Sequence, residues 1–444
     1  MALVNKKSGL SLSDLVAIAA GQVIGAGVVT LVGPAIAATG VSAWLAYGVS
    51  VFMGFLSIIP FMFLSSALTL KGGEYSIIER MLGEKYAGFY IVAYIGQCLG
   101  VSLMGLSLGT YLNYLIPVDK RILAIIGLTF FLGANLKGVQ VMAKLQKALT
   151  VILLGCLGLF TVVGIFHLGP QAFDFSSPEF FTHGFHGFAS AVALYAFSTY
   201  GQYMVINFGH AAKNPKRDIP LAMIIASGII LVVYVGIALV SSGILPISET
   251  ANKPLTVVAQ RILPGPLLPL FVFGGPLMAL ATTVNSFYSA RSTPLLRATK
   301  DGWFPAFFGR TNSSNVPYVL MIMIWLIGVV PVIINMSIKQ ITNNVVLVAY
   351  LLRMIIAVAT LRLPTLYKEQ WEKSFLHIPN TLFYLITIIA ILAQCYMVYL
   401  SARSLNVFMA ACNFGFVALC AVYAMLRAKA GMVHIQSVSV EDLQ

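Results

Sequence analysis

The chain has 444 residues, of which 59% are hydrophobic and only 9% are charged. Soluble domains average about 45–50% apolar and about 25% charged residues, so this composition excludes a soluble protein and indicates one that crosses a membrane many times. The formal net charge of +13 raises the alternative of nucleic-acid binding. However, most basic residues lie in the segments that would face one side of the membrane. We therefore interpret the positive charge as a sign of membrane topology and expect no nucleic-acid partner.

Twelve apolar stretches approach the roughly 20 residues that a membrane-spanning helix needs. They cover residues 12–38, 42–69, 89–115, 121–137, 144–167, 188–210, 219–243, 266–296, 317–335, 341–362, 380–401 and 404–427. If the N-terminus lies inside, 20 of the 27 Lys and Arg fall in inside segments and six in outside segments, with Arg353 within a span. This bias predicts a multi-pass protein of the plasma (inner) membrane with both termini in the cytoplasm.

Two of the stretches carry glycine and small polar residues in their middle, at Gly25-Ala26-Gly27 and at Ser198-Thr199-Tyr200-Gly201. Lipid offers no water to unpaired backbone groups, so a break in a spanning helix is tolerated only where it is buried or lines a cavity. A pair of interrupted spans in corresponding halves of a chain points to a transporter's binding site.

The position of the breaks predicts the organisation of the chain. Five spans per repeat would force the second copy into the opposite orientation, and each break then lies in the first span of its repeat. We therefore expect an all-α membrane protein with a 5+5 inverted repeat plus two C-terminal helices. Its parts would be a cytoplasmic N-terminus (1–11), the repeats (12–168 and 188–362), spans 11 and 12 (380–427) and a cytoplasmic tail (428–444).

The breaks offer backbone groups that match an amino acid. After a break the helix begins with free N–H groups, which suit a carboxylate, and before it the helix ends with free carbonyls, which suit an ammonium group. Carbonyls of Gln22, Val23 and Ile24 would suit an ammonium group, and the second break offers those of Phe197 and Ser198. The alternative is that the glycines only allow close helix packing.

Ionisable residues narrow the chemistry. All fourteen Asp and Glu fall at span ends, in loops or in tails, whereas a proton relay or a cation site would place one in mid-span. The sequence also has no metal-ligand cluster, no pore charge ring and no catalytic cluster, so we expect no cofactor, metal, channel or enzyme. Arg353 either faces the bundle interior or snorkels to the surface.

Four landmarks in the expected order carry a resemblance. They are Gly25-Ala26-Gly27, Gly72-Gly73-Glu74-Tyr75, the span from Phe197 to Gly201 with 213–220 after it, and Asn285 to Arg291 with 301–305 after it. In these residues the chain resembles the amino acid–polyamine–organocation superfamily. It is most similar to the branch of L-amino-acid transporters and the arginine–agmatine exchanger, among which a bacterial alanine–serine–cysteine exchanger is one candidate.

The resemblance implies a leucine-transporter-like fold and a set of substrate-binding residues. Val23, Ile24, Gly25, Ala26 and Gly27 would hold the α-carboxylate and part of the ammonium group, and Phe197 would cap the substrate as a gate.

In the same resemblance, other spans complete the site. Ser198 and Tyr200 would line the second break, and the substrate side chain would meet span 8 at Asn285, Ser286 and Phe287.

Ion coupling remains open in the sequence. Many relatives carry a lysine in span 5, a position that falls near Leu153 here, although a shift brings Lys147 closer. Thr282 and Thr283 could contribute oxygens to a sodium site instead.

The resulting hypothesis is a secondary active transporter that works by alternating access. We expect sodium-independent exchange of small neutral L-amino acids, without an obligate protein partner. The alternatives are a sodium- or proton-coupled symporter, an exchanger of cationic amino acids or polyamines, and a nutrient receptor that does not transport.

Overall fold

The computed structural model describes residues 9–434 apart from 197, 337, 404 and 406, and within this part every regular element is helical. Seven helical stretches are long and apolar enough to cross a membrane: Val32–Ala67, Glu84–Asn113, Val139–Ile165, Pro215–Gly243, Leu267–Lys300, Asn380–Tyr399 and Val407–Lys429. Three shorter apolar helices join them, at Leu12–Val23, Tyr318–Ile333 and Leu347–Thr360. The chain is therefore a multi-pass, all-α membrane protein.

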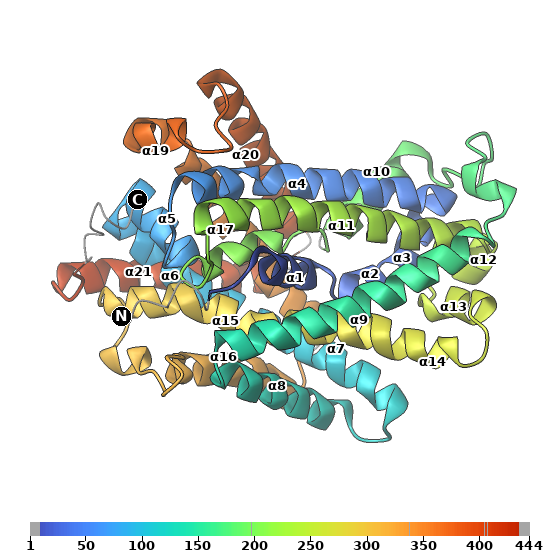
Figure 1. The fold of residues 1–444 in the computed structure, drawn as a ribbon, viewed down its shortest axis with the longest axis horizontal. Coiled ribbons are helices and arrows are strands. Elements are labelled where there is room, and N and C mark those ends of the chain that lie inside the picture. The colour runs from blue at the N-terminus through green and yellow to red at the C-terminus, as the bar shows by residue number, and fades with distance from the viewer. Residues whose placement is uncertain (1–8, 197, 337, 404, 406, 435–444) are drawn as a thin grey trace.

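The elements follow one another in the order drawn in Figure 1. The first half contains α1 (Leu12–Val23), α2 (Ala26–Thr30), α3 (Val32–Thr39), η2 (Gly40–Ser42), α4 (Ala43–Ala67), α5 (Gly73–Leu82), α6 (Glu84–Gln97), α7 (Gly100–Leu115), α8 (Lys120–Leu136), α9 (Val139–Ile165) and η3 (Pro170–Phe173). The second half contains α10 (Gly184–Ala196), η4 (Gln202–Phe208), α11 (Pro215–Gly243), α12 (Ile247–Thr250), α13 (Thr256–Ile262), α14 (Leu267–Val272), the π-helical turn η5 (Phe273–Leu277), α15 (Met278–Lys300), η6 (Ala306–Gly309), α16 (Tyr318–Ile333), α17 (Ile338–Thr360), α18 (Leu363–Leu366), α19 (Lys368–Glu372), α20 (Asn380–Arg403) and α21 (Val407–Lys429).

Both predicted helix breaks are confirmed. The first span is helical to Val23 and resumes at Ala26, so its break is at Ile24 and Gly25. The second is helical to Ala196 and resumes at Gln202 as the 3₁₀-helix η4.

The interrupted helices lie in the middle of the bundle. Helix α1 packs against α9, α11, α15 and η4, and α10 packs against α3 and α4. Figure 1 shows the long helices running roughly side by side, with α5 and α19 toward one end and α12 and α13 toward the other. The breaks are thus enclosed by other helices and not presented to lipid, as the cost of unpaired backbone groups requires.

The last two helices are peripheral. Only 22% of the apolar window of α20 and 17% of that of α21 are buried, against 67% for the stretch that contains α15. Exposed large side chains such as Leu392, Phe408 and Leu419 give these helices surfaces that suit lipid.

Candidate functional site

At the first break, side-chain hydroxyls hold the backbone groups that the helix releases. The Tyr234 hydroxyl donates to the carbonyl of Val23 at 2.8 Å, and the backbone N–H of Gly25 donates to the same carbonyl at 2.8 Å. Two residues before Val23, the carbonyl of Gly21 accepts the Thr283 hydroxyl at 3.0 Å. Gly25 has extended backbone angles, and α2 then begins without a side-chain cap, so its first N–H groups have no acceptor within the helix.

The second break is held by its own hydroxyl and by two tyrosines. Ser198 Oγ donates to the carbonyl of Tyr195 at 2.9 Å and lies 3.0 Å from the Tyr47 hydroxyl. Tyr234 also contacts this break, since its hydroxyl lies 3.3 Å from the carbonyl of Ser198. Phe197, the predicted gate, lies outside the described residues.

The two breaks, which are about 170 residues apart in the sequence, touch one another. A Cβ built on Gly27 would overlap Ser198, because its nearest neighbours are Cβ and Oγ of that residue. A Cβ on Gly201 would lie 2.7 Å from the carbonyl oxygen of Gln22, and the φ of Gly201, +153°, is one that side chains rarely adopt. Glycine at both positions is what lets the breaks approach so closely.

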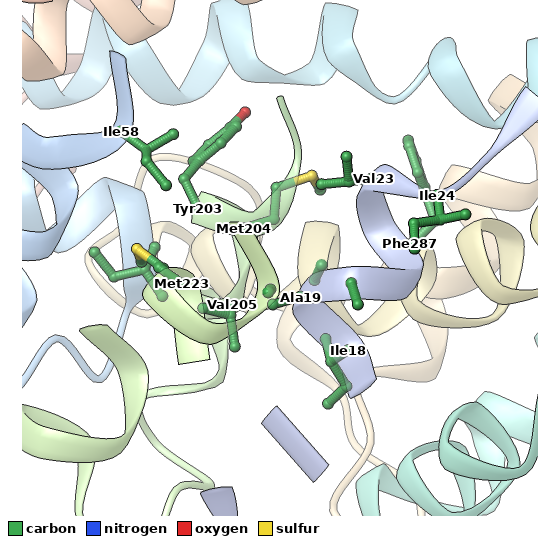
Figure 2. Close-up of a cluster of buried hydrophobic side chains, with 14 of the residues drawn as sticks. Ile18, Ala19, Val23, Ile24, Ile58, Tyr203, Met204, Val205, Met223 and Phe287 are labelled. Atoms are coloured by element: carbon green, nitrogen blue, oxygen red, sulfur yellow. The ribbon is translucent and has the colours of Figure 1, made fainter. Parts of the chain in front are cut away.

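The residues around the first break are closed off from water. Val23 is 4% exposed, Ile24 is fully buried, and Gly25 and Gly27 are buried. Figure 2 shows Ile24 beside Phe287 of α15 and Val23 beside Met204 of η4. The predicted residues of the first break, together with Ser198 and Phe287, therefore gather in one buried region.

Tyr200 lies at the edge of this region. Its ring meets the ring of Tyr350 edge-on, with 5.7 Å between the ring centroids. It thus faces α17, and not the α1 side of the break.

The polar side chains of the other two predicted residues of α15 bond to α9 and to α15 itself. The Asn285 amide donates to Gln146 Oε1 at 2.8 Å and to the carbonyl of Met142 at 3.1 Å, so it faces α9. Ser286 Oγ donates to the carbonyl of Thr282 in its own helix at 2.9 Å. Phe287, the third member of the predicted trio, stands beside Ile24 at the first break (Figure 2).

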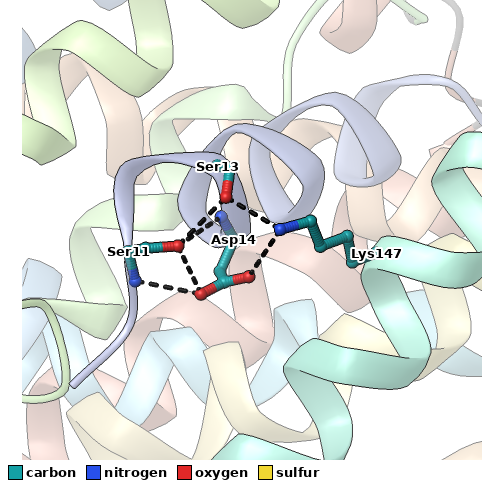
Figure 3. Close-up of polar contacts among 4 residues, drawn as sticks. All are labelled: Ser11, Ser13, Asp14 and Lys147. Atoms are coloured by element: carbon teal, nitrogen blue, oxygen red, sulfur yellow. Dashed lines mark hydrogen bonds and ion pairs between the residues drawn. The ribbon is translucent and has the colours of Figure 1, made fainter. Parts of the chain in front are cut away.

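Of the three candidate coupling residues, the two threonines lie near the break and Lys147 does not. Lys147 Nζ donates to Ser13 Oγ at 2.9 Å and lies 3.6 Å from Asp14 Oδ1 (Figure 3). Asp14 also closes a capping box with Ser11, which fixes the start of α1. Lys147 therefore joins α9 to the beginning of α1, far along that helix from Gly25.

Uncharged side chains fill the place between α1 and α9. The Gln146 amide and the Thr150 hydroxyl both donate to the carbonyl of Ala17, at 3.4 and 3.2 Å. Thr282 donates to Ala279 in its own helix at 2.9 Å, and Leu153 is fully buried. The contact of α9 with the Ala17 carbonyl is thus made by an amide and a hydroxyl group and not by a lysine.

A buried charged cluster escaped the sequence reasoning. Glu74 of α5 is fully buried, and its carboxylate accepts hydrogen bonds from Tyr90 at 2.8 Å, from Asn207 at 2.8 Å and from Tyr94 at 3.3 Å. The sequence predicts that Glu74 lies in a loop between two spans. This segment instead forms helix α5, which packs into the bundle and buries Glu74.

Arg291, within the predicted span 266–296, is a second buried charged residue. It is 6% exposed, donates to Gln97 Oε1 at 2.6 Å and has its guanidinium carbon 5.0 Å from the centre of the Tyr94 ring. Arg353 is therefore not the one basic residue inside the bundle.

Helix α5 carries another acidic residue, Glu79, whose pKa is raised. Burial and the neighbouring charge of Asp301 raise the pKa of Glu79 to about 7, and Arg297 opposes the shift. The guanidinium of Arg297 lies 3.8 Å from Glu79 Oε1 and 3.3 Å from Asp301 Oδ2. Glu79 therefore titrates near neutral pH.

Comparison with known proteins places the chain among transporters. It is 25% identical over 352 residues to a methylthioribose transporter of Bacillus subtilis, covering 72% of this chain and 73% of the relative. It is 22% identical over 344 residues to the branched-chain amino acid permease BcaP of the same species, covering 70% and 72%.

A shorter match is closer in sequence. Over 107 residues, 24% of each chain, it is 34% identical to a cadaverine/lysine antiporter of Escherichia coli strain K12. The family described as amino acid permease matches residues 10–426. This match covers nearly the whole chain, which therefore belongs to the amino acid permeases of the amino acid–polyamine–organocation superfamily and is a transporter, not an enzyme.

Proposed function

We propose that this chain exchanges amino acids across the plasma (inner) membrane by alternating access, without sodium, and that its substrates are small neutral L-amino acids. The observation that carries the proposal is the contact between the two breaks, at Gly27 against Ser198 and at Gly201 against Gln22. Two helix interruptions that touch in a buried region bring a helix N-terminus and freed carbonyls to one place.

The backbone groups at this place suit both ends of a zwitterion. The first turn of α2, from Ala26, presents N–H groups without an acceptor in the helix, and these suit a carboxylate. The carbonyls of Ile24 and Ser198 lie at the ends of the preceding helical segments, where an ammonium group is favoured. Tyr234 holds the two breaks in register through the Val23 and Ser198 carbonyls.

The polar contacts near the first break support exchange without sodium. The carbonyl of Gly21 already accepts the Thr283 hydroxyl, so one of its two lone pairs is not available to a cation. Gln146 and Thr150, both uncharged, occupy the adjoining face of α9.

The topology belongs to the same proposal. Twelve spans would comprise inverted repeats at 12–168 and 188–362, with spans 11 and 12 at 380–427. The two broken helices support this division, since each opens one repeat. The segments 1–11 and 428–444 would be cytoplasmic, because most Lys and Arg then fall inside.

Efflux from proteoliposomes tests the mode of transport. Vesicles are loaded with labelled alanine and diluted into sodium buffer with or without unlabelled alanine. A third dilution uses unlabelled alanine in buffer with choline in place of sodium. Exchange predicts efflux only when an amino acid is present outside, at the same rate in sodium and in choline. Equal efflux into empty buffer, or efflux that requires sodium, would overturn the proposed mode.

A further inference from the structure

Arg353 of α17 lies in a cage of three tyrosine rings. Its guanidinium carbon is 4.7 Å from the ring centre of Tyr350, 5.0 Å from that of Tyr200 and 5.4 Å from that of Tyr203. All three distances are within the roughly 6 Å at which a cation is attracted to an aromatic face. The rings stabilise the positive charge, but ring faces satisfy few of the five N–H donors of a guanidinium.

Two of the donor atoms have no hydrogen-bond acceptor. Nε and Nη1 of Arg353 are buried, and none of the described residues accepts a hydrogen bond from them. The described carboxylates also form no ion pair with this side chain. A charged group left unpaired inside a spanning bundle is costly and is by default a sign of function.

The neighbouring charges do not neutralise Arg353. The carboxylate of Glu74 accepts hydrogen bonds from Tyr90, Tyr94 and Asn207. Tyr94 also lies under the guanidinium of Arg291, so Tyr94 connects Glu74 with Arg291. Among the described residues, no carboxylate compensates the positive charge of Arg353.

The cage adjoins the proposed substrate site. Tyr200 belongs to the second break and follows Ser198 by two residues, so their Cα atoms are at most ~7 Å apart. The next residue, Gly201, approaches the carbonyl of Gln22 at the first break. The Tyr200 ring, which contacts the guanidinium at 5.0 Å, therefore links Arg353 to the second break.

We propose that Arg353 is a specificity-determining residue that receives the side chain of the transported amino acid. Its ligand is a planar, oxygen-terminated group, a carboxamide or a carboxylate, which matches the fork of N–H donors of a guanidinium. The same charge repels lysine, arginine and polyamines. This inference rests on the proposed function. It specifies the side chain of the transported amino acid, which is either a neutral carboxamide or a carboxylate.

Three amino acids of nearly equal size test the inference on the unaltered protein. Leucine, asparagine and aspartate differ mainly in the end of the side chain. Each is tested as a competitor of labelled alanine uptake, and ornithine is added as a cationic competitor. Asparagine or aspartate should compete about 10- to 100-fold better than leucine, because leucine leaves the two donors unpaired. If asparagine is the strongest competitor, the substrates are neutral amino acids. If aspartate is the strongest competitor, the substrates are acidic amino acids.

Variants of Arg353 identify the residue responsible. Arg353→Met should reduce the preference for asparagine or aspartate over leucine to within about threefold and improve competition by ornithine, whereas Arg353→Lys should keep the rejection of ornithine. Arg310→Gln, at an exposed position, is the matched control and should leave all ratios unchanged. Monodispersity in detergent identifies any variant that does not fold.

The outcomes separate this inference from the proposed function. If leucine competes as well as asparagine and aspartate, or if Arg353→Met keeps the preference, the role of Arg353 is refuted while amino acid exchange stands. If no amino acid competes at all, the proposed function itself fails.

Discussion

Gly27→Ala is the substitution that most directly perturbs the contact between the two breaks. The added methyl group would overlap Cβ of Ser198 and lie 3.2 Å from its Oγ, whereas carbon atoms in contact prefer about 3.5–4.0 Å. Insertion of a methyl group into a packed core typically costs about 1–3 kcal/mol. If this cost falls on the closed form of the site, apparent affinity falls about 5- to 150-fold.

Uptake by proteoliposomes measures this loss, with the concentration dependence of uptake compared between variants of equal monodispersity. Gly228→Ala is the matched control, because a methyl group there meets no atom within 4 Å. It should transport as the unaltered protein does.

The double variant Gly27→Ala, Ser198→Gly separates the clash from other causes. Removal of the Ser198 side chain removes the atoms that the new methyl group would meet, so the double variant should transport better than Gly27→Ala alone. Normal transport by Gly27→Ala, or a double variant no better than the single one, would refute the close approach of the two breaks.

Three further substitutions test other contacts. Tyr234→Phe removes the hydroxyl shared by the Val23 and Ser198 carbonyls; the loss of one hydrogen bond predicts an affinity about 2- to 13-fold lower in equilibrium binding, and unchanged affinity would argue against the bridge. Lys147→Met removes a half-exposed ion pair, so uptake should stay within about fivefold of normal, and a far larger loss would restore Lys147 as a coupling residue. Glu79 keeps its proton up to about pH 7 in the folded protein, whereas the unfolded chain releases it near the ordinary glutamate pKa of 4.5. Its contribution to stability therefore falls as pH rises through this window, and Glu79→Gln should flatten the decline of the melting temperature between pH 5 and 7.5; an equally steep decline would contradict this assignment.

The breaks could be predicted from the sequence because they violate a strong local rule. Glycine and small polar residues at Gly25 and at Gly201 stand where a continuous helix would satisfy the backbone most simply. Such a violation is visible along the chain without knowledge of any neighbour. In the structure the first break lies at Ile24 and Gly25, close to the predicted Gly25-Ala26-Gly27.

The direction of side chains on intact helices could not be predicted in the same way. Asn285 and Phe287 are two residues apart on α15, so they face different neighbours, and a small error in register exchanges their roles. Lys147 and Gln146 present the same problem on α9, where the amide faces α1 at Ala17 and the amine turns toward Ser13. In a helix that is apolar on most sides, periodicity does not say which face meets which partner.

The buried charges were hidden for a different reason. Glu74 belongs to a polar stretch between two spans, which in the sequence resembles any solvated loop. Its burial depends on Tyr90, Tyr94 and Asn207, which reach it from other elements. Long-range packing of this kind has no local sequence signal.

The central claim is that backbone groups of the two breaks together bind both ends of an amino acid, and competition by truncated substrates tests it most directly. Alanine is compared with ethylamine, which lacks the carboxylate, and with propionate, which lacks the amine, as competitors of labelled alanine uptake. The account predicts that alanine competes and that neither analogue does, even when it is present in large excess. Competition by ethylamine or by propionate with an affinity near that of alanine would contradict a site built for both groups.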